Sequence, residues 1–165
     1  MSDRFTPVDQ ERIEAMLDGF NLKHFRGEDG TTHTAFPGLV VFFHLESAGF
    51  KISTRWLATA KTAEEITALR LAANELNRLM PLVRVHPVLR EDHTAVAIFE
   101  APFFTPGGLT DEQLQSMLEF YFSAIHHMAD QLNQELPDLT DPLPGTTNPA
   151  PAKNPESPES PESEA

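Results

Sequence analysis

Histidine and carboxylate side chains are the groups in this sequence that could do metal or acid–base chemistry. The chain holds seven histidines and no cysteine, so a metal would depend on nitrogen and oxygen ligands. His126 and His127 are adjacent, and on a helix their side chains point about 100° apart, which makes a shared metal difficult. His86 and His93 could meet across a hairpin, so a metal-dependent enzyme using this pair is one hypothesis. The HExxH spacing of zinc enzymes does not occur in the sequence.

Nucleophile and phosphate motifs are no stronger. The sequence contains no Gly-x-Ser-x-Gly elbow, which would present a serine nucleophile. Glu64 and Glu65 are paired carboxylates, but they lie at a predicted helix start, where capping explains them. Gly107 and Gly108 are not followed by the Lys-Ser/Thr of a phosphate loop. We therefore predict that the protein is not an enzyme, binds no cofactor and has no metal site.

The charge balance narrows the kinds of partner. Twelve basic residues stand against 25 acidic ones, a formal charge of −13, which argues against binding to nucleic acid or to an anionic membrane surface. The first ten residues lack the apolar run of a signal peptide. No stretch approaches the roughly 20 apolar residues that span a bilayer. We expect a cytoplasmic protein without disulfides.

One long amphipathic helix is predicted over residues 110–136. Thr110 and Gln113 have the spacing of a capping box, in which each side chain binds the other residue's backbone amide. Apolar residues then recur at steps of three and four, which is the pattern of one buried helix face. Such a stripe needs a surface to pack on, because packing supplies most of a helix's stability. The strands earlier in the chain are the expected surface.

The remaining elements alternate between hairpins and helices. We predict helices over 8–18 and 62–80, strands over 22–26, 38–45, 50–57, 82–88 and 94–101, and a polar turn over 27–34. The order is α-β-β-β-α-β-β-α. Strands joined as hairpins pair antiparallel, so the fold class is α+β, with a mainly antiparallel five-stranded sheet covered by helices.

The composition changes after residue 136. Proline, serine, threonine and glutamate dominate the segment 137–165, and the triplet Pro-Glu-Ser recurs at 155, 158 and 161. Such a segment buries too little apolar surface to offset its ordering entropy. We predict a folded domain over 1–136 and a disordered acidic tail over 137–165.

Five residues are candidates for contact with a partner. Trp56 is the only tryptophan, and it either packs in the core or anchors a binding face. Asn74 and Asn77 are poor helix formers within the helix 62–80, and either bind loop backbone or contact a partner. Leu71 and Leu79 fall outside the apolar stripe of that helix. They are either ordinary exposed leucines or a partner contact.

Three segments carry a resemblance to a known family: ISTRWLA at 52–58, AANELNRLMPLVRV at 72–85 and FTPGGLTDEQLQSMLEFYFSAI at 104–125. They resemble the YbjN-domain family, whose members are often called putative bacterial sensory transduction regulators and are common in actinobacteria. The matching motifs are the pair Arg55–Trp56, the element Asn74-x-x-Asn77 with Pro81 after it, and the helix start Gly108–Leu114. The resemblance implies a fold similar to the type III secretion chaperones, small acidic proteins that bind extended segments of other proteins.

Two hypotheses for function follow. The first is a non-enzymatic protein-binding module with a regulatory or chaperone-like role in bacterial signalling. Its partner is a protein of unknown identity, and a homodimer is possible. The alternative is a small-ligand sensor, with a pocket between the sheet and the helix 110–136.

Overall fold

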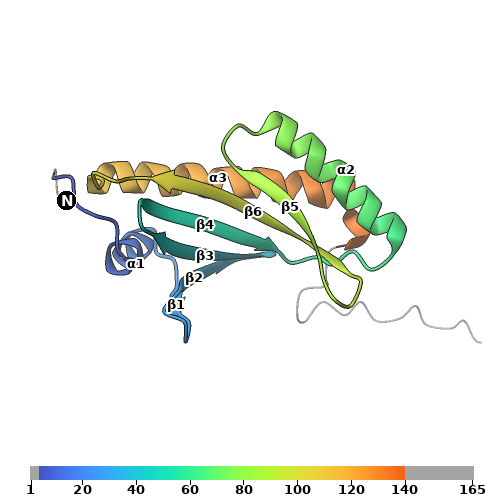
Figure 1. Cartoon of the computed structure of the whole chain (residues 1–165), viewed down its shortest axis with the longest axis horizontal. Helices are drawn as coiled ribbons and strands as arrows, with labels where there is room; N and C mark the ends of the chain where they lie inside the picture. Colours follow the sequence, from blue (N-terminus) through green and yellow to red (C-terminus); the bar gives the residue numbers. More distant parts are fainter. Residues whose placement is uncertain (1–3, 140–165) are drawn as a thin grey trace, which may run out of the picture.

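The structure is a computed structural model of the 165-residue chain and describes residues 4–139 (Figure 1). It has the predicted α+β fold class. The helices are α1 (Gln10–Gly19), α2 (Ala63–Leu79), α3 (Asp111–Glu135) and a short 3-10 helix η1 (Pro137–Leu139). The strands are β1 (His24–Arg26), β2 (Thr32–Phe36), β3 (Leu39–Glu46), β4 (Gly49–Trp56), β5 (Arg84–Leu89) and β6 (Ala95–Phe104).

The strands form one antiparallel sheet in the order β1-β2-β3-β4-β6-β5. It has six strands where the sequence predicted five, because β2 begins inside the segment predicted as a turn over 27–34. The turn itself is shorter: the Gly27 N–H donates to the Thr31 carbonyl at 2.9 Å. Thr32 and Thr34 then alternate with exposed or half-buried residues, and both are fully buried. The polar residues of β2 made this segment look like a turn in the sequence.

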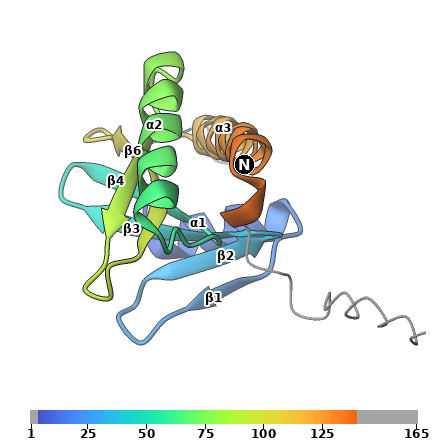
Figure 2. The same ribbon diagram turned by 90° about the vertical axis from the view of Figure 1, so that its right-hand side faces the viewer.

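All three long helices pack on one face of the sheet. α2 and α3 lie side by side above the sheet in Figure 2. α1 joins the same face, where its Glu14 accepts a hydrogen bond from the Thr32 hydroxyl at 2.7 Å. The opposite face has no helix over it within residues 4–139 and is called the open face below. The molecule therefore has two layers with one core between them.

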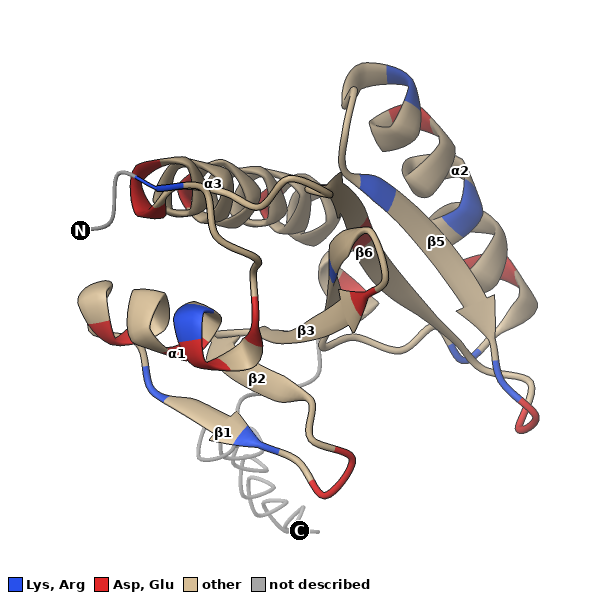
Figure 3. Cartoon of the chain, turned by 60° about the vertical axis from the view of Figure 1, so that its left-hand side comes forward, with Lys and Arg blue, Asp and Glu red and all other residues tan. Residues whose placement is uncertain are grey.

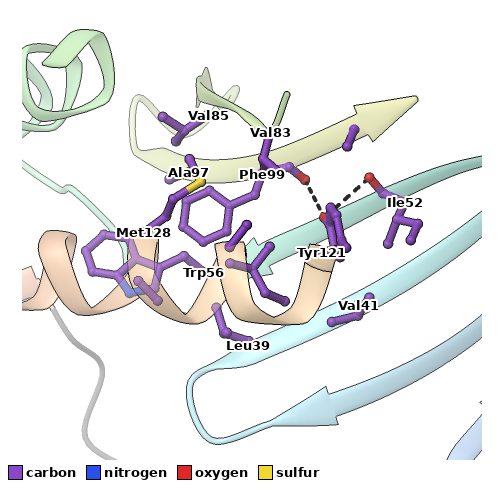
Figure 4. Close-up of a cluster of buried hydrophobic side chains, with 14 of the residues drawn as sticks. Leu39, Val41, Ile52, Trp56, Val83, Val85, Ala97, Phe99, Tyr121 and Met128 are labelled. Atoms are coloured by element: carbon purple, nitrogen blue, oxygen red, sulfur yellow. Dashed lines mark hydrogen bonds between the residues drawn. The ribbon is translucent and has the colours of Figure 1, made fainter. Parts of the chain in front are cut away.

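Tyr121 lies near the middle of that core (Figure 4). It comes from α3, is fully buried, and its hydroxyl lies 2.8 Å from the Thr54 hydroxyl on β4. The same hydroxyl is 3.3 Å from the backbone carbonyls of Ile52 and Phe99. A buried phenol is thus satisfied by groups of β4 and β6, which fixes α3 against these two strands.

The start of α3 confirms the predicted capping box. The Gln113 N–H donates to the Thr110 hydroxyl, and the Thr110 N–H donates to the Gln113 side chain. Just before it, Gly108 has φ +79°, and a Cβ there would lie 2.4 Å from the Thr6 backbone. Thr6 forms a β-bridge with Leu109, and Asp9 is the N-cap of α1.

The described chain ends three residues beyond the predicted domain boundary at 136. Leu139 is 5% exposed, and its carbonyl accepts a hydrogen bond from the Thr59 N–H at 3.3 Å. The prediction of disorder is therefore wrong for residues 137–139, because Leu139 completes the core beside α3. The rest of the predicted tail, 140–165, lies outside the described residues. None of the helices within 4–139 is long and apolar enough to cross a membrane.

Candidate functional site

Trp56, the first of the predicted contact residues, is used inside the domain. Its side chain is 2% exposed, and its indole N–H donates to the Asn133 side-chain oxygen on α3 at 3.0 Å. The core alternative for this residue therefore describes what the structure shows. A role for Trp56 in partner contact stays a prediction, and it would require this buried ring to become exposed.

Asn77 binds backbone, as one of its two alternatives proposed, but its target is a strand. The Asn77 amide nitrogen donates to the Val85 carbonyl at 2.8 Å, and the Val85 N–H donates to the Asn77 side-chain oxygen at 2.8 Å. The Arg84 guanidinium also donates to the Asn77 backbone carbonyl. The Asn77 side chain thus stands where a further strand would pair with β5.

This arrangement protects the edge of the sheet. β5 is an outer strand, and unpaired backbone groups on such a strand invite pairing with other chains. Asn77 occupies the groups of Val85, and Pro87 two residues on has no N–H to offer. Strand addition at β5 is therefore disfavoured, and contact with another protein is better supported by the side-chain surfaces.

Asn74 lies on the outer face of α2 and is exposed. The same face carries Leu71 and Leu79, which are 65% and 62% exposed, and Leu82 just beyond the helix is 60% exposed. Residues three, four, seven and eight apart share one side of a helix. The two leucines that fell outside the predicted stripe therefore join Asn74 and the ion pair Glu75–Arg78 in an exposed surface of apolar and polar side chains, here called the α2 face.

Two adjoining hollows extend the α2 face toward the end of α3. The first has a volume of about 420 Å³ and is lined by Ala63, Glu64, Thr67, Ala68 and Leu71. The second, about 240 Å³, shares Glu64 and Ala68 and continues to η1; its other lining residues are Glu65, Glu135, Leu136, Pro137, Asp138 and Leu139. The floor is apolar and the charged lining residues are all acidic, so the hollows suit an apolar side chain with a cation beside it.

Hydrogen bonds hold two carboxylates of α2 in their charged form. Backbone N–H groups of Lys61 and Thr62 lower the pKa of Glu65 below its ordinary value. The Arg78 guanidinium lowers the pKa of Glu75. Glu65 is thereby committed to the capping box of α2, and Glu75 neutralises the basic residue on the α2 face. The acidic character of this region persists at neutral pH.

His86 and His93, the pair behind the metal hypothesis, have different surroundings in the structure. His86 lies 3.7 Å from Glu100 on the open face, whereas His93 sits in the β5–β6 turn with φ +64°. His44 contacts the Ser53 hydroxyl at 2.9 Å, which agrees with its place on a sheet face. Within the described part of the chain, no group of three or more histidine, aspartate or glutamate side chains is placed to hold a metal ion.

The space between the sheet and α3, where the ligand-sensor hypothesis placed a pocket, is filled by core side chains. Leu114, Leu118, Ile125 and Met128 of α3 are each 0% exposed, and they belong to the same cluster as Phe99 of the sheet. The hollows on the α2 face lie outside this core. Sequence reasoning missed those hollows, and the exposed leucines of α2 were the available signal.

The structure is a small α+β domain in which the three long helices cover one face of the sheet. The chain belongs to the YbjN family, because the family model, described as "Putative bacterial sensory transduction regulator", matches residues 9–134. The crystal structure of YbjN from E. coli, described as a putative transcription regulator, is similar with a TM-score of 0.70. At 14% identity, over 84% of this chain and 99% of that chain, the likeness shows the fold. No curated protein matches this chain.

Proposed function

We propose that this chain is a non-enzymatic protein-binding module in bacterial regulation, and that it takes its partner through the α2 face. One observation carries the proposal. Leu71 and Leu79 on one side of α2, and Leu82 just beyond the helix, are each at least 60% exposed. Single exposed leucines are ordinary, but a row of them beside an apolar hollow is typical of a contact surface. The family's description as a regulator supports a role exerted through another molecule.

The chemistry of the surface describes the partner. Apolar side chains of the partner would cover the leucines and enter the hollow beside Leu71. The acidic residues Glu64, Glu135 and Asp138 at the adjoining hollow favour lysine or arginine next to those apolar side chains. The proposed ligand is a basic amphipathic segment of another protein. A second copy of this chain is the competing occupant, and a cytoplasmic location stays a prediction.

A co-purification experiment tests this proposal. Tagged wild-type protein, the double variant Leu71→Glu/Leu79→Glu and the control Phe104→Glu are incubated with extract of the native organism and compared by quantitative mass spectrometry. Phe104 is 77% exposed and lies on β6, so its substitution puts a glutamate at an exposed apolar position away from α2. We expect one set of proteins to be retained by wild type and control and lost with the double variant.

Light scattering across a range of protein concentrations addresses the competing occupant. A wild-type dimer that the double variant cannot form assigns the α2 face to a second copy. Retention of the same proteins by the wild type, the control and the double variant contradicts the proposal.

A further inference from the structure

The open face differs in charge from the helices. The three long helices carry eleven acidic residues against the basic residues Arg12, Arg70 and Arg78. Figure 3 shows acidic segments on each of them and a basic segment at the start of β5. The alternation of the strands turns Lys51, Arg55 and Arg84 to the open face, with Glu46 and Glu100 as its acids. A strongly acidic chain thus has one face with a cationic excess.

Arg55 is the unexplained residue of that face. It lies on the central strand β4, between Val40 of β3 and Ile98 of β6, which are its cross-strand neighbours. Its Nε atom is buried and has no hydrogen-bond partner among residues 4–139. The two ion pairs on this face join Glu100 to Lys51 at 3.6 Å and to His86 at 3.7 Å, and leave Arg55 out. A guanidinium between apolar side chains gains most from a carboxylate that binds it directly.

An aromatic row borders Arg55 on the same face. The rings of Phe25 and His33 are stacked with centroids 5.6 Å apart, the ring of Phe42 lies 5.8 Å from His33, and His44 follows at 6.5 Å. The open face thus offers flat rings, two of them phenylalanines, beside the cations Arg55 and Lys51 of β4. Proline rings pack well on aromatic faces, and carboxylates pair with guanidinium groups.

We propose that the chain's own acidic segment 153–165 binds the open face, with its glutamates on Arg55 and Lys51 and its prolines on the aromatic row. The segment has Pro-Glu-Ser at 155, 158 and 161, so a proline and a carboxylate recur every third residue. A polyproline II helix has three residues per turn, so this repeat places its glutamates along one side and its prolines along another. The composition of the segment matches the two components of the surface.

The chain leaves the domain at a place that permits this contact. Leu139 is fixed by the Thr59 N–H, three residues after the end of β4, the strand that carries Arg55. The 17 residues from there to Glu156 can span up to about 55 Å. Six strands are about 24 Å across. Length therefore does not limit the contact, and the bound segment would screen the open face from other proteins.

Paramagnetic relaxation in the full-length chain tests this inference. The absence of cysteine allows a single nitroxide label at Ser163→Cys. At about 20 mM salt we expect selective broadening of the amide signals of β3, β4 and β6. Salt at about 1 M, which shortens the screening length to about 3 Å, should remove the broadening. The variants Arg55→Gln and Glu156→Gln/Glu159→Gln/Glu162→Gln/Glu164→Gln should also lose it.

The matched control is Arg70→Gln, which removes one positive charge from the exposed side of α2 and should keep the broadening. The glutamate variant leaves every residue of the domain unchanged, so it remains decisive even where Arg55→Gln lowers stability. Broadening that is absent, confined to the helices or unchanged in the glutamate variant overturns the proposal. Broadening between labelled and isotope-labelled chains in a mixed sample also overturns it, because the occupant is then a second copy. The α2 face takes no part in these readouts, so this proposal and the proposed function fail independently.

Discussion

Thr54 and Arg55 are neighbours on β4, and they show how differently the two faces of the sheet are built. Thr54 faces the helices, is fully buried, and its hydroxyl is paired with that of Tyr121. Arg55 faces the other way, and its buried Nε has no partner in the described part of the chain. On the covered face, which lies under the helices, the Thr54 hydroxyl has its hydrogen-bond partner within the same chain. On the open face, the Arg55 Nε has none among the described residues. Stability should therefore depend on the covered face and binding on the surfaces beyond it.

The largest effect is expected from a cavity in the covered face. Leu118→Ala should lower the free energy of unfolding by about 2–5 kcal/mol, because Leu118 is 0% exposed and its removal leaves a void. Leu71→Ala is the matched control, since 65% of that side chain is already exposed. Urea denaturation followed by tryptophan fluorescence measures both. Equal losses at the two positions would break the distinction between the buried and the exposed leucines.

Thr54→Val tests the polar part of the covered face. The substitution keeps the shape of the side chain and removes the hydroxyl 2.8 Å from Tyr121. Loss of a buried hydrogen bond costs about 1–3 kcal/mol, which the same urea experiment resolves. Because the Ile52 and Phe99 carbonyls remain near the phenol, the lower half of that range is expected. A stabilised variant would mean that the hydroxyl pair is not needed there.

The stability of the protein at high pH tests the burial of the Tyr121 phenol. Burial raises the pKa of Tyr121 above its ordinary value. The folded protein then holds a proton that the unfolded chain loses above pH about 10, so stability should fall by up to about 1.4 kcal/mol per pH unit from there. Tyr121 is the only tyrosine, so ultraviolet absorbance reports it directly. Its ionisation should coincide with unfolding. Ionisation in the native state below pH 11 would contradict its place in the core.

The elements that could be predicted from the sequence are those with a clear local pattern of residues. The capping box at Thr110, the apolar stripe after it and the alternation of β4 were sufficient for α3 and the central sheet. β2 escaped prediction because its buried residues are threonines, whose burial depends on Glu14 of α1 and on the backbone of Lys23. Pairing across the chain, and not local composition, makes it a strand.

The surfaces could be predicted less well than the core, and for a physical reason. Asn77 was expected to bind loop backbone or contact a partner, but only the fold brings the strand residue Val85 beside it. The cationic excess of the open face depends on strand register, which places Arg55 between Val40 and Ile98. A sequence gives a residue's type, whereas a contact surface depends on which residues from separate strands face the same way.

Asn77→Ala should have a smaller effect on stability than the core substitutions. Its two hydrogen bonds to Val85 lie at a half-exposed edge, where water can replace them, so a loss of about 1 kcal/mol is expected. A second consequence is unpaired backbone on β5 and faster self-association. Light scattering during incubation at raised concentration measures it, with Gln134→Ala as control, because Gln134 carries the same amide group, is exposed on α3 and lies outside the α2 face. Equal association rates would remove the edge-protection role.

The smallest change should come from Arg55, one residue from Thr54. Removing one member of a buried pair is costly because it leaves the other without a partner, but Arg55 leaves no such partner within the domain. Arg55→Leu should therefore change the free energy of unfolding by less than about 1 kcal/mol, and can stabilise, because leucine suits the side chains of Val40 and Ile98. Measurement at about 1 M salt removes any contribution of the acidic segment. A loss in the free energy of unfolding as large as that of Thr54→Val would show that Arg55 stabilises the fold. Arg55 would then not be a residue reserved for binding.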